Sequence, residues 1–227
     1  MDGIWQVGPL IIHKEWVVII VSYILTAALL HYLAYFPEYK KTQTDIAGNV
    51  LFLFIVVYQL SSFIFYFPLT WQDPMAVLAS PGSWKEWTIA WAAGGVYLYI
   101  FSRPVKSLFF QLAVYVFLTF LLTEFFYTAF YTYTQPATIH SFYQMSIAAA
   151  TFFTFTFLRK KLTYERLLYL LLLLYSLSMI MMNLISSAKM LFIYMPQEPF
   201  FGAAAIALIG FIRLFMKWGG FTIDRNE

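Results

Sequence analysis

Glu124 and His140 are the two residues of this chain whose types and spacing could do chemistry. Glu124 is the one charged side chain in the apolar stretch Ser107 to Thr134, which reads SLFFQLAVYVFLTFLLTEFFYTAFYTYT. A carboxyl in such surroundings is costly unless it is protonated or partnered. His140 opens the next apolar stretch after a short turn around Pro136, so we expect it near the same end. A histidine beside a carboxylate can act as a general base; the alternative is a buried hydrogen bond that ties two antiparallel helices together.

A second group of residues has the types that would contact a lipid. Tyr127 and Tyr143 lie on either side of this turn, and amphipathic aromatic rings gather where a membrane meets water. Gln144 adds an amide group beside them, and two adjacent glycines interrupt an earlier apolar stretch. We therefore assign lipid contact to Gly94, Gly95, Tyr127, Tyr143 and Gln144.

Several kinds of site are excluded by residues that the sequence lacks. It has no cysteine, so disulfides, thiolate metal sites and cysteine nucleophiles are ruled out. Its three histidines are scattered and give no metal-ligand cluster. The HExxH, GxxxxGK[ST] and GxGxxG motifs do not occur. We therefore expect neither a metal nor a cofactor, and nothing in the pattern indicates nucleic acid.

The elements that position these residues follow from the composition. Hydrophobic residues make up 62 % of the 227 positions and charged residues only 11 %, whereas soluble domains average about 25 % charged residues. The pattern predicts an all-α integral membrane protein with a single transmembrane domain over residues 1–227. Its seven predicted transmembrane helices cover residues 16–36, 46–67, 87–101, 107–134, 140–158, 164–185 and 200–218.

Lysines and arginines segregate between alternate loops of this arrangement. Eleven of the fourteen fall in the loops of one side, and only Lys14, Lys85 and Lys189 fall on the other. Basic residues concentrate in cytoplasmic loops. The asymmetry therefore predicts an N-terminus outside the membrane and a C-terminus in the cytoplasm.

Two loops on the predicted outer side are longer than the inner ones. They cover Pro68 to Glu86, which contains the run PMAVLA, and Ser186 to Pro199. Each has an apolar run between proline-containing turns. We expect one or two turns of interfacial helix in each.

Four short motifs occur in a fixed order along the chain. They are Val7–Ile11 (VGPLI), Asp73–Leu78 (DPMAVL), Ala92–Val96 (AAGGV) and Ile139–Gln144 (IHSFYQ). In this order the chain resembles bacterial prolipoprotein diacylglyceryl transferase, which has Gly-Pro-Leu, Asn-Pro, His-Gly-Gly and Pro-Thr-Gln-Leu-Tyr-Glu motifs at these places. The resemblance covers nearly the whole length. It implies a seven-span protein of the bacterial cytoplasmic membrane with its N-terminus outside.

The charged residues that serve the family's reaction do not carry over. The family transfers a diacylglyceryl group from phosphatidylglycerol to a lipoprotein cysteine, with a histidine and arginines at the charged head group. Here Ala93 replaces the histidine, the glycine-arginine signature falls near Leu122 to Glu124, and the later arginine falls near Met179. An uncharged site cannot stabilise an anionic phosphate electrostatically, so the original reaction is not expected.

These observations leave three hypotheses. The leading one is a non-catalytic relative of the transferase that binds a phospholipid such as phosphatidylglycerol, a lipoprotein or a partner membrane subunit. The alternative is a diverged lipid-group transferase that uses Glu124 and His140 at the outer leaflet. The third is a transporter or a structural subunit of a membrane complex.

Overall fold

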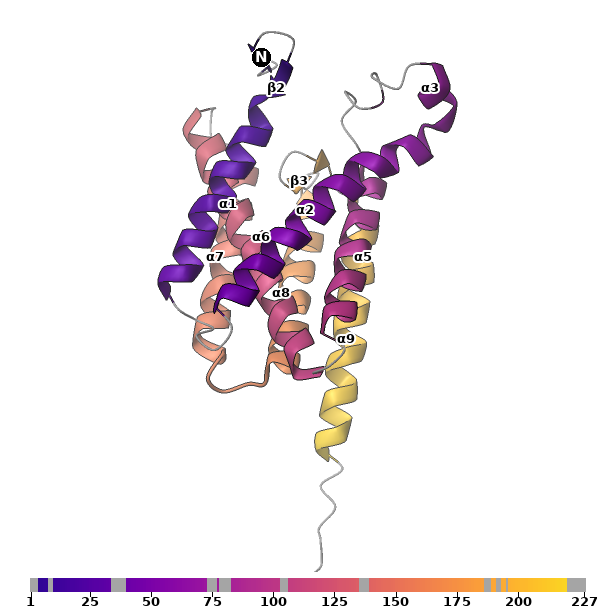
Figure 1. Ribbon diagram of the computed structural model, residues 1–227. Coiled ribbons are helices and arrows are strands. Elements are labelled where there is room, and N and C mark those ends of the chain that lie inside the picture. Colours follow the sequence, from indigo (N-terminus) through magenta and orange to yellow (C-terminus); the bar gives the residue numbers. More distant parts are fainter. Residues whose placement is uncertain are drawn as a thin grey trace, which may run out of the picture.

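The computed structural model is a bundle of helices with two short hairpins at one end (Figure 1). It describes residues 4–7, 10–33, 40–72, 77, 83–102, 106–134, 139–185, 189–190, 193–194 and 196–219. A helix lies over each of the seven ranges that the sequence predicts to be helical. The seven are α1 (Lys14–Leu33), α2 (Lys40–Phe65), α5 (Trp84–Phe101), α6 (Lys106–Thr134), α7 (Ile139–Leu158), α8 (Tyr164–Ile185) and α9 (Glu198–Gly219).

Helix α5 begins at Trp84 rather than at the predicted Trp87 because a capping box stabilises its first turn. The Glu86 carboxylate accepts hydrogen bonds from the Ser83 backbone N–H at 2.8 Å and from the Ser83 hydroxyl. The Ser83 hydroxyl in turn accepts from the Lys85 backbone N–H at 3.3 Å. These bonds pair backbone N–H groups that a helix start leaves open.

Of the two longer loops that are predicted to lie on the outer side, the second differs from the prediction. Residues 186–199 hold an antiparallel hairpin, β3 (Lys189–Met190) with β4 (Ile193–Tyr194), in place of a helical turn, which suits the aromatic and β-branched residues of β4. In the loop before α5, the short helix α3 covers Phe67–Gln72, and the PMAVLA run lies outside the described residues except for Val77.

A second hairpin at the start of the chain was not predicted. It pairs β1 (Ile4–Val7) with β2 (Leu10–His13), with Val7 opposite Leu10. Helix α1 follows β2 directly, so the hairpin sits at the end of the bundle where α1 begins (Figure 1).

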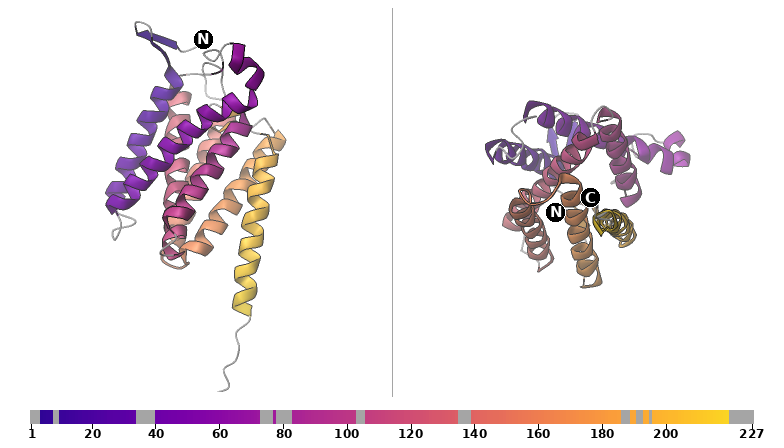
Figure 2. Two further views of the ribbon diagram at one scale, coloured as in Figure 1. Left: turned by 45° about the vertical axis from the view of Figure 1, so that its right-hand side comes forward. Right: turned by 90° about the horizontal axis from the view of Figure 1, so that it is seen from below.

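Helix α6 is the centre of the bundle. It packs against α1, α2, α5, α7 and α8, while α9 lies outside against α8 (Figure 2). Helix α6 is apolar all round, the pattern of a helix that is surrounded by other helices or by lipid. Leu112, Val114, Leu118 and Leu121 on it are fully buried.

Among the residues that the structure describes, three helices are long and apolar enough to cross a membrane. They cover Asp45–Phe65, Leu108–Tyr133 and Tyr164–Leu184, and Val17–Leu33 is a shorter apolar helix. Large hydrophobic side chains also face outward, among them Phe52, Ile64, Leu184 and Ile209, each at least two-thirds exposed. Contiguous apolar surface of this kind is unusual on a soluble monomer. The fold is therefore compatible with a membrane protein.

Candidate functional site

The Glu124 carboxyl lies at the junction of α6, α7 and α8, where both of its oxygens accept hydrogen bonds. Oε1 accepts from the Gln144 side-chain amide of α7, and Oε2 accepts from the Tyr175 hydroxyl of α8, each at 2.6 Å. All three side chains are buried, with Glu124 only 1 % exposed. We call Glu124, Gln144 and Tyr175 the carboxyl cluster. It joins three helices through two hydrogen bonds in an apolar interior.

The cluster differs in membership from the predicted pair of Glu124 and His140. Gln144, predicted as a lipid contact, instead donates to Glu124. His140 lies one helical turn before Gln144 on α7 and is half-buried, which places it on the same side of the helix. A catalytic role for Glu124 and His140 stays a prediction, and the described geometry gives Glu124 a bridging role between helices.

Tyr175 was missed by the sequence analysis. It lies in the middle of the apolar helix α8, and a buried tyrosine hydroxyl usually finds a hydrogen-bond partner. The position of this tyrosine far from either helix end could therefore have indicated a buried hydrogen bond. Glu124 was the strongest candidate for its acceptor.

The remaining predicted lipid contacts do not form one site. Gly94 is buried against α2, where a Cβ would lie 3.4 Å from the Val50 side chain, whereas Gly95 faces open space. Tyr127 is buried and stacks on Tyr131, with ring centroids 6.2 Å apart. Tyr143 is about half exposed. Gly94 therefore serves helix packing, and the two tyrosines lie in different environments.

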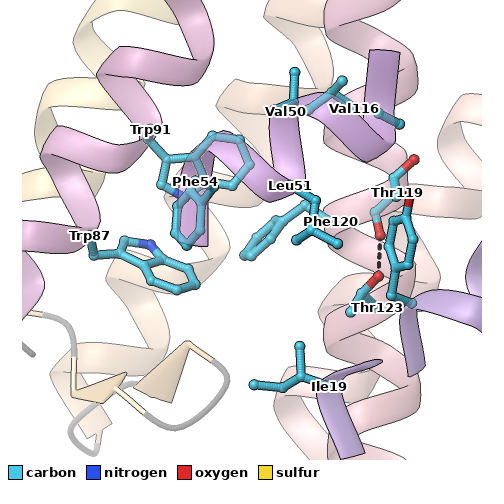
Figure 3. Close-up of a pocket in the computed structure, with 12 residues that line it drawn as sticks. Ile19, Val50, Leu51, Phe54, Trp87, Trp91, Val116, Thr119, Phe120 and Thr123 are labelled. Carbon is cyan, nitrogen blue, oxygen red and sulfur yellow. Dashed lines mark hydrogen bonds between the residues drawn. The ribbon is translucent and has the colours of Figure 1, made fainter. Parts of the chain in front are cut away.

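A cavity that the sequence analysis did not predict lies between α1, α2, α5 and α6 (Figure 3). Its volume is about 70 Å³ and it is partly open, so it is smaller than the pockets that enclose whole small molecules. The described side chains around it are apolar, aromatic or hydroxyl-bearing, and none of them is charged. They are Ile19, Tyr23, Ala47, Val50, Leu51, Phe54, Trp87, Trp91, Val116, Thr119, Phe120 and Thr123.

Aromatic rings hold one wall of this cavity in place. Phe54 of α2 meets Trp87 of α5 edge-on at 4.6 Å between ring centroids, and Trp91 meets Phe120 of α6 edge-on at 5.0 Å. Such edge-to-face pairs favour one relative orientation of the rings. Figure 3 shows Phe54, Trp87 and Trp91 on the side of the cavity opposite Thr119 and Thr123.

The hydroxyls on the other wall are already bonded to their own helix. Thr123 Oγ1 donates to the Thr119 carbonyl at 2.7 Å, and Thr119 Oγ1 donates to the Tyr115 carbonyl at 2.9 Å. A hydroxyl bonded in this way adds little polarity to a surface. The cavity therefore suits an apolar occupant.

Helices α1 and α2 border the cavity without packing closely on each other. Within the described part of the chain, α1 packs chiefly on α6 and α2 packs chiefly on α5. From the end where α1 stops and α2 starts, the two helices diverge toward the end that carries α3 (Figures 1 and 2). Residues of both helices line the cavity, so a chain-like molecule could approach it between α1 and α2.

Comparison with models of protein families and with curated proteins finds no match to this chain. The resemblance to the lipid transferase therefore stays a prediction. Gly8, Pro9 and Asp73–Ala76 of its motifs lie outside the described residues. Met179, near the place of the family's later arginine, is fully buried in the core.

Proposed function

We propose that this chain is an integral membrane protein that holds part of a lipid acyl chain in the cavity between α1, α2, α5 and α6, without catalysing a reaction on it. The observation that carries the proposal is the cavity itself. None of the described residues on its lining is charged, and residues of both α1 and α2 line it.

An acyl chain is the occupant that a membrane supplies. Lipid tails are as apolar as leucine, so burial from water is not the driving force inside a bilayer. An empty cavity still loses dispersion contacts along its lining. A lipid chain that enters between α1 and α2 restores these contacts. A polar substrate would find no charged side chain there to pair with.

The proposal places all seven long helices across the membrane, with the N-terminus outside. Helix α7 illustrates why a helix with many hydroxyls can still span. Its Ser146, Thr151 and Thr154 hydroxyls each donate to the carbonyl one turn earlier, at 2.8 Å. A hydroxyl satisfied within its own helix costs little in lipid. The eleven-to-three division of basic residues supports the orientation.

The carboxyl cluster supports a non-catalytic assignment. Glu124 follows Thr123, which lines the cavity, and successive residues of an α-helix point about 100° apart. Both Glu124 oxygens are occupied by donors from α7 and α8. The carboxyl is thus directed away from the cavity. The alternative of a transferase that uses Glu124 and His140 predicts that Glu124→Gln abolishes lipid transfer.

The experiment is to count the lipids that co-purify with the protein. Ala47→Phe fills the cavity from α2, where Ala47 is 5 % exposed. The matched control is Ala28→Phe on the exposed side of α1. Native mass spectrometry should show bound phospholipid on the parent and on the control, and a loss of most of it on Ala47→Phe. Equal lipid on all three proteins would remove the proposal, and phosphatidylglycerol-dependent transfer by the parent would remove its non-catalytic part.

A further inference from the structure

Among the residues that the structure describes, the Trp87 indole N–H has no hydrogen-bond partner, and it is buried beside the cavity. Trp87 is 3 % exposed and lines the cavity. Buried indole N–H groups are normally paired, and an unpaired one needs an explanation. A ligand that brings an acceptor oxygen into the cavity would supply the missing hydrogen-bond partner.

The protein groups around the cavity do not offer this N–H a good acceptor. Figure 3 shows the Trp87 nitrogen on the edge of the ring that faces Phe54 and Trp91. The edge-on contact with Phe54, at 4.6 Å, offers at most an N–H···π interaction. That contact is much weaker than an N–H···O bond. An oxygen atom that reached the indole would therefore be bound in preference.

The position of Trp87 along α5 matches the depth of a lipid ester group. Ser83 caps α5, and Trp87 lies four residues further, about 6 Å along the helix axis. The polar zone on each side of a bilayer is roughly 5–7 Å thick, and tryptophan is enriched at this boundary. Glycerolipid ester carbonyls lie where the head groups meet the hydrocarbon. If the cap of α5 lies at the surface, Trp87 is at the level of these carbonyls.

We propose that the Trp87 indole N–H donates a hydrogen bond to the ester carbonyl oxygen of a glycerolipid whose acyl chain occupies the cavity. This inference rests on the proposed function and narrows its ligand to ester-linked lipids. Ether-linked lipids have the same hydrocarbon chains but lack the carbonyl oxygen. Because the described lining residues carry no charge, the cavity itself does not select a particular lipid head group.

The test compares diacyl phosphatidylglycerol with its dialkyl ether analogue of equal chain length, each added to the delipidated full-length protein. One neutral hydrogen bond predicts about a five-fold preference for the ester. Trp87→Phe keeps an aromatic ring but removes the N–H, so this variant should bind the ester lipid and the ether lipid equally well. The control Trp91→Phe, on the same wall of the cavity, should keep it. Native mass spectrometry gives both affinities.

A second measurement follows the indole N–H itself, and the Trp87→Phe variant identifies the Trp87 signal among those of the seven tryptophans. In protein labelled with ¹⁵N-tryptophan, the Trp87 Nε1–H resonance should move downfield with the ester lipid and not with the ether lipid. Equal binding of the two lipids by the parent would overturn the role of Trp87 and leave lipid binding intact. A Trp87→Phe variant that still prefers the ester would overturn it as well. Binding of neither lipid would instead remove the proposed function.

Discussion

At the scale of single residues, the carboxyl cluster is a closed polar unit in an apolar bundle. Glu124 meets Gln144 and Tyr175 through one hydrogen bond to each oxygen. In hydrocarbon surroundings an unpaired polar group costs more free energy than it would in contact with water, because no water molecule replaces the lost partner. The cluster thus makes the packing of α6 against α7 and α8 specific, since a shifted helix would leave one of these polar groups without its hydrogen-bond partner.

Double-mutant analysis should detect this coupling. Tyr175→Phe should lower the free energy of unfolding by about 0.6 to 1.7 kcal/mol, the range for hydrogen bonds between membrane helices. Glu124→Leu should cost more, because it leaves both donors buried without an acceptor. The double variant should be less destabilised than the sum of the two, since each change removes the same bond. Detergent-induced unfolding monitored by circular dichroism measures all three, and strict additivity would show that the contact is not an energetic link.

At the scale of the helices, α9 packs extensively against α8 and approaches it closely at one glycine. A Cβ at Gly210 of α9 would lie 2.6 Å from Cζ of Tyr169 on α8, which is an overlap. At Gly202 of the same helix a Cβ would meet nothing within 4 Å. Small residues at helix interfaces in membranes allow backbones to approach in this way.

Gly210→Ala should therefore destabilise the protein by about 1 to 3 kcal/mol, the usual cost of overpacking. Gly202→Ala is the matched control and should be neutral or slightly stabilising, because alanine favours a helix over glycine. Tyr169→Ala combined with Gly210→Ala should recover part of the loss, since the clashing ring is gone. Thermal unfolding of the four proteins in one detergent compares them. A Gly210→Ala variant as stable as the Gly202→Ala control would mean that the ring moves aside without cost.

The helices were predictable from sequence because long apolar runs between charged or proline-containing turns fix where a membrane helix can lie. The start of α5 was placed late because its first turn is polar, although Ser83 and Glu86 have the spacing of a capping box. The hairpin β3–β4 was missed because a strand of two residues has no periodicity to detect.

The candidate site was less predictable. Helix α6 is apolar on every face, so periodicity could not show which side Glu124 takes. Gln144 was found as a polar residue of interest, but Tyr175, the other donor to Glu124, is fifty-one residues from Glu124 along the chain. The cavity depends on how far α1 and α2 diverge, and no residue pattern encodes that distance. Its lining residues look like ordinary packing residues in the sequence.

At the scale of the whole molecule, two arrangements in the membrane follow from different criteria. Length and mean hydropathy alone select three spanning helices among the described residues, within α2, α6 and α8. The charge distribution and the alternating directions of the helices favour seven. The two arrangements disagree about α1, α5, α7 and α9, and α7 is the helix tested below. If α7 spans, its two ends lie on opposite sides of the membrane, and otherwise they lie on the same side.

Cysteine labelling can decide this, because the chain has no cysteine of its own and the background is therefore zero. Tyr133, near the end of α6, is 90 % exposed, and Lys160, in the turn after α7, is also exposed. With seven spans, a membrane-impermeant maleimide should label Tyr133→Cys in intact cells and Lys160→Cys only after permeabilisation. Denatured samples, in which both cysteines must react, are the control. Labelling of both sites from the same side would place α7 on the membrane surface, and the seven-span arrangement would have to be given up.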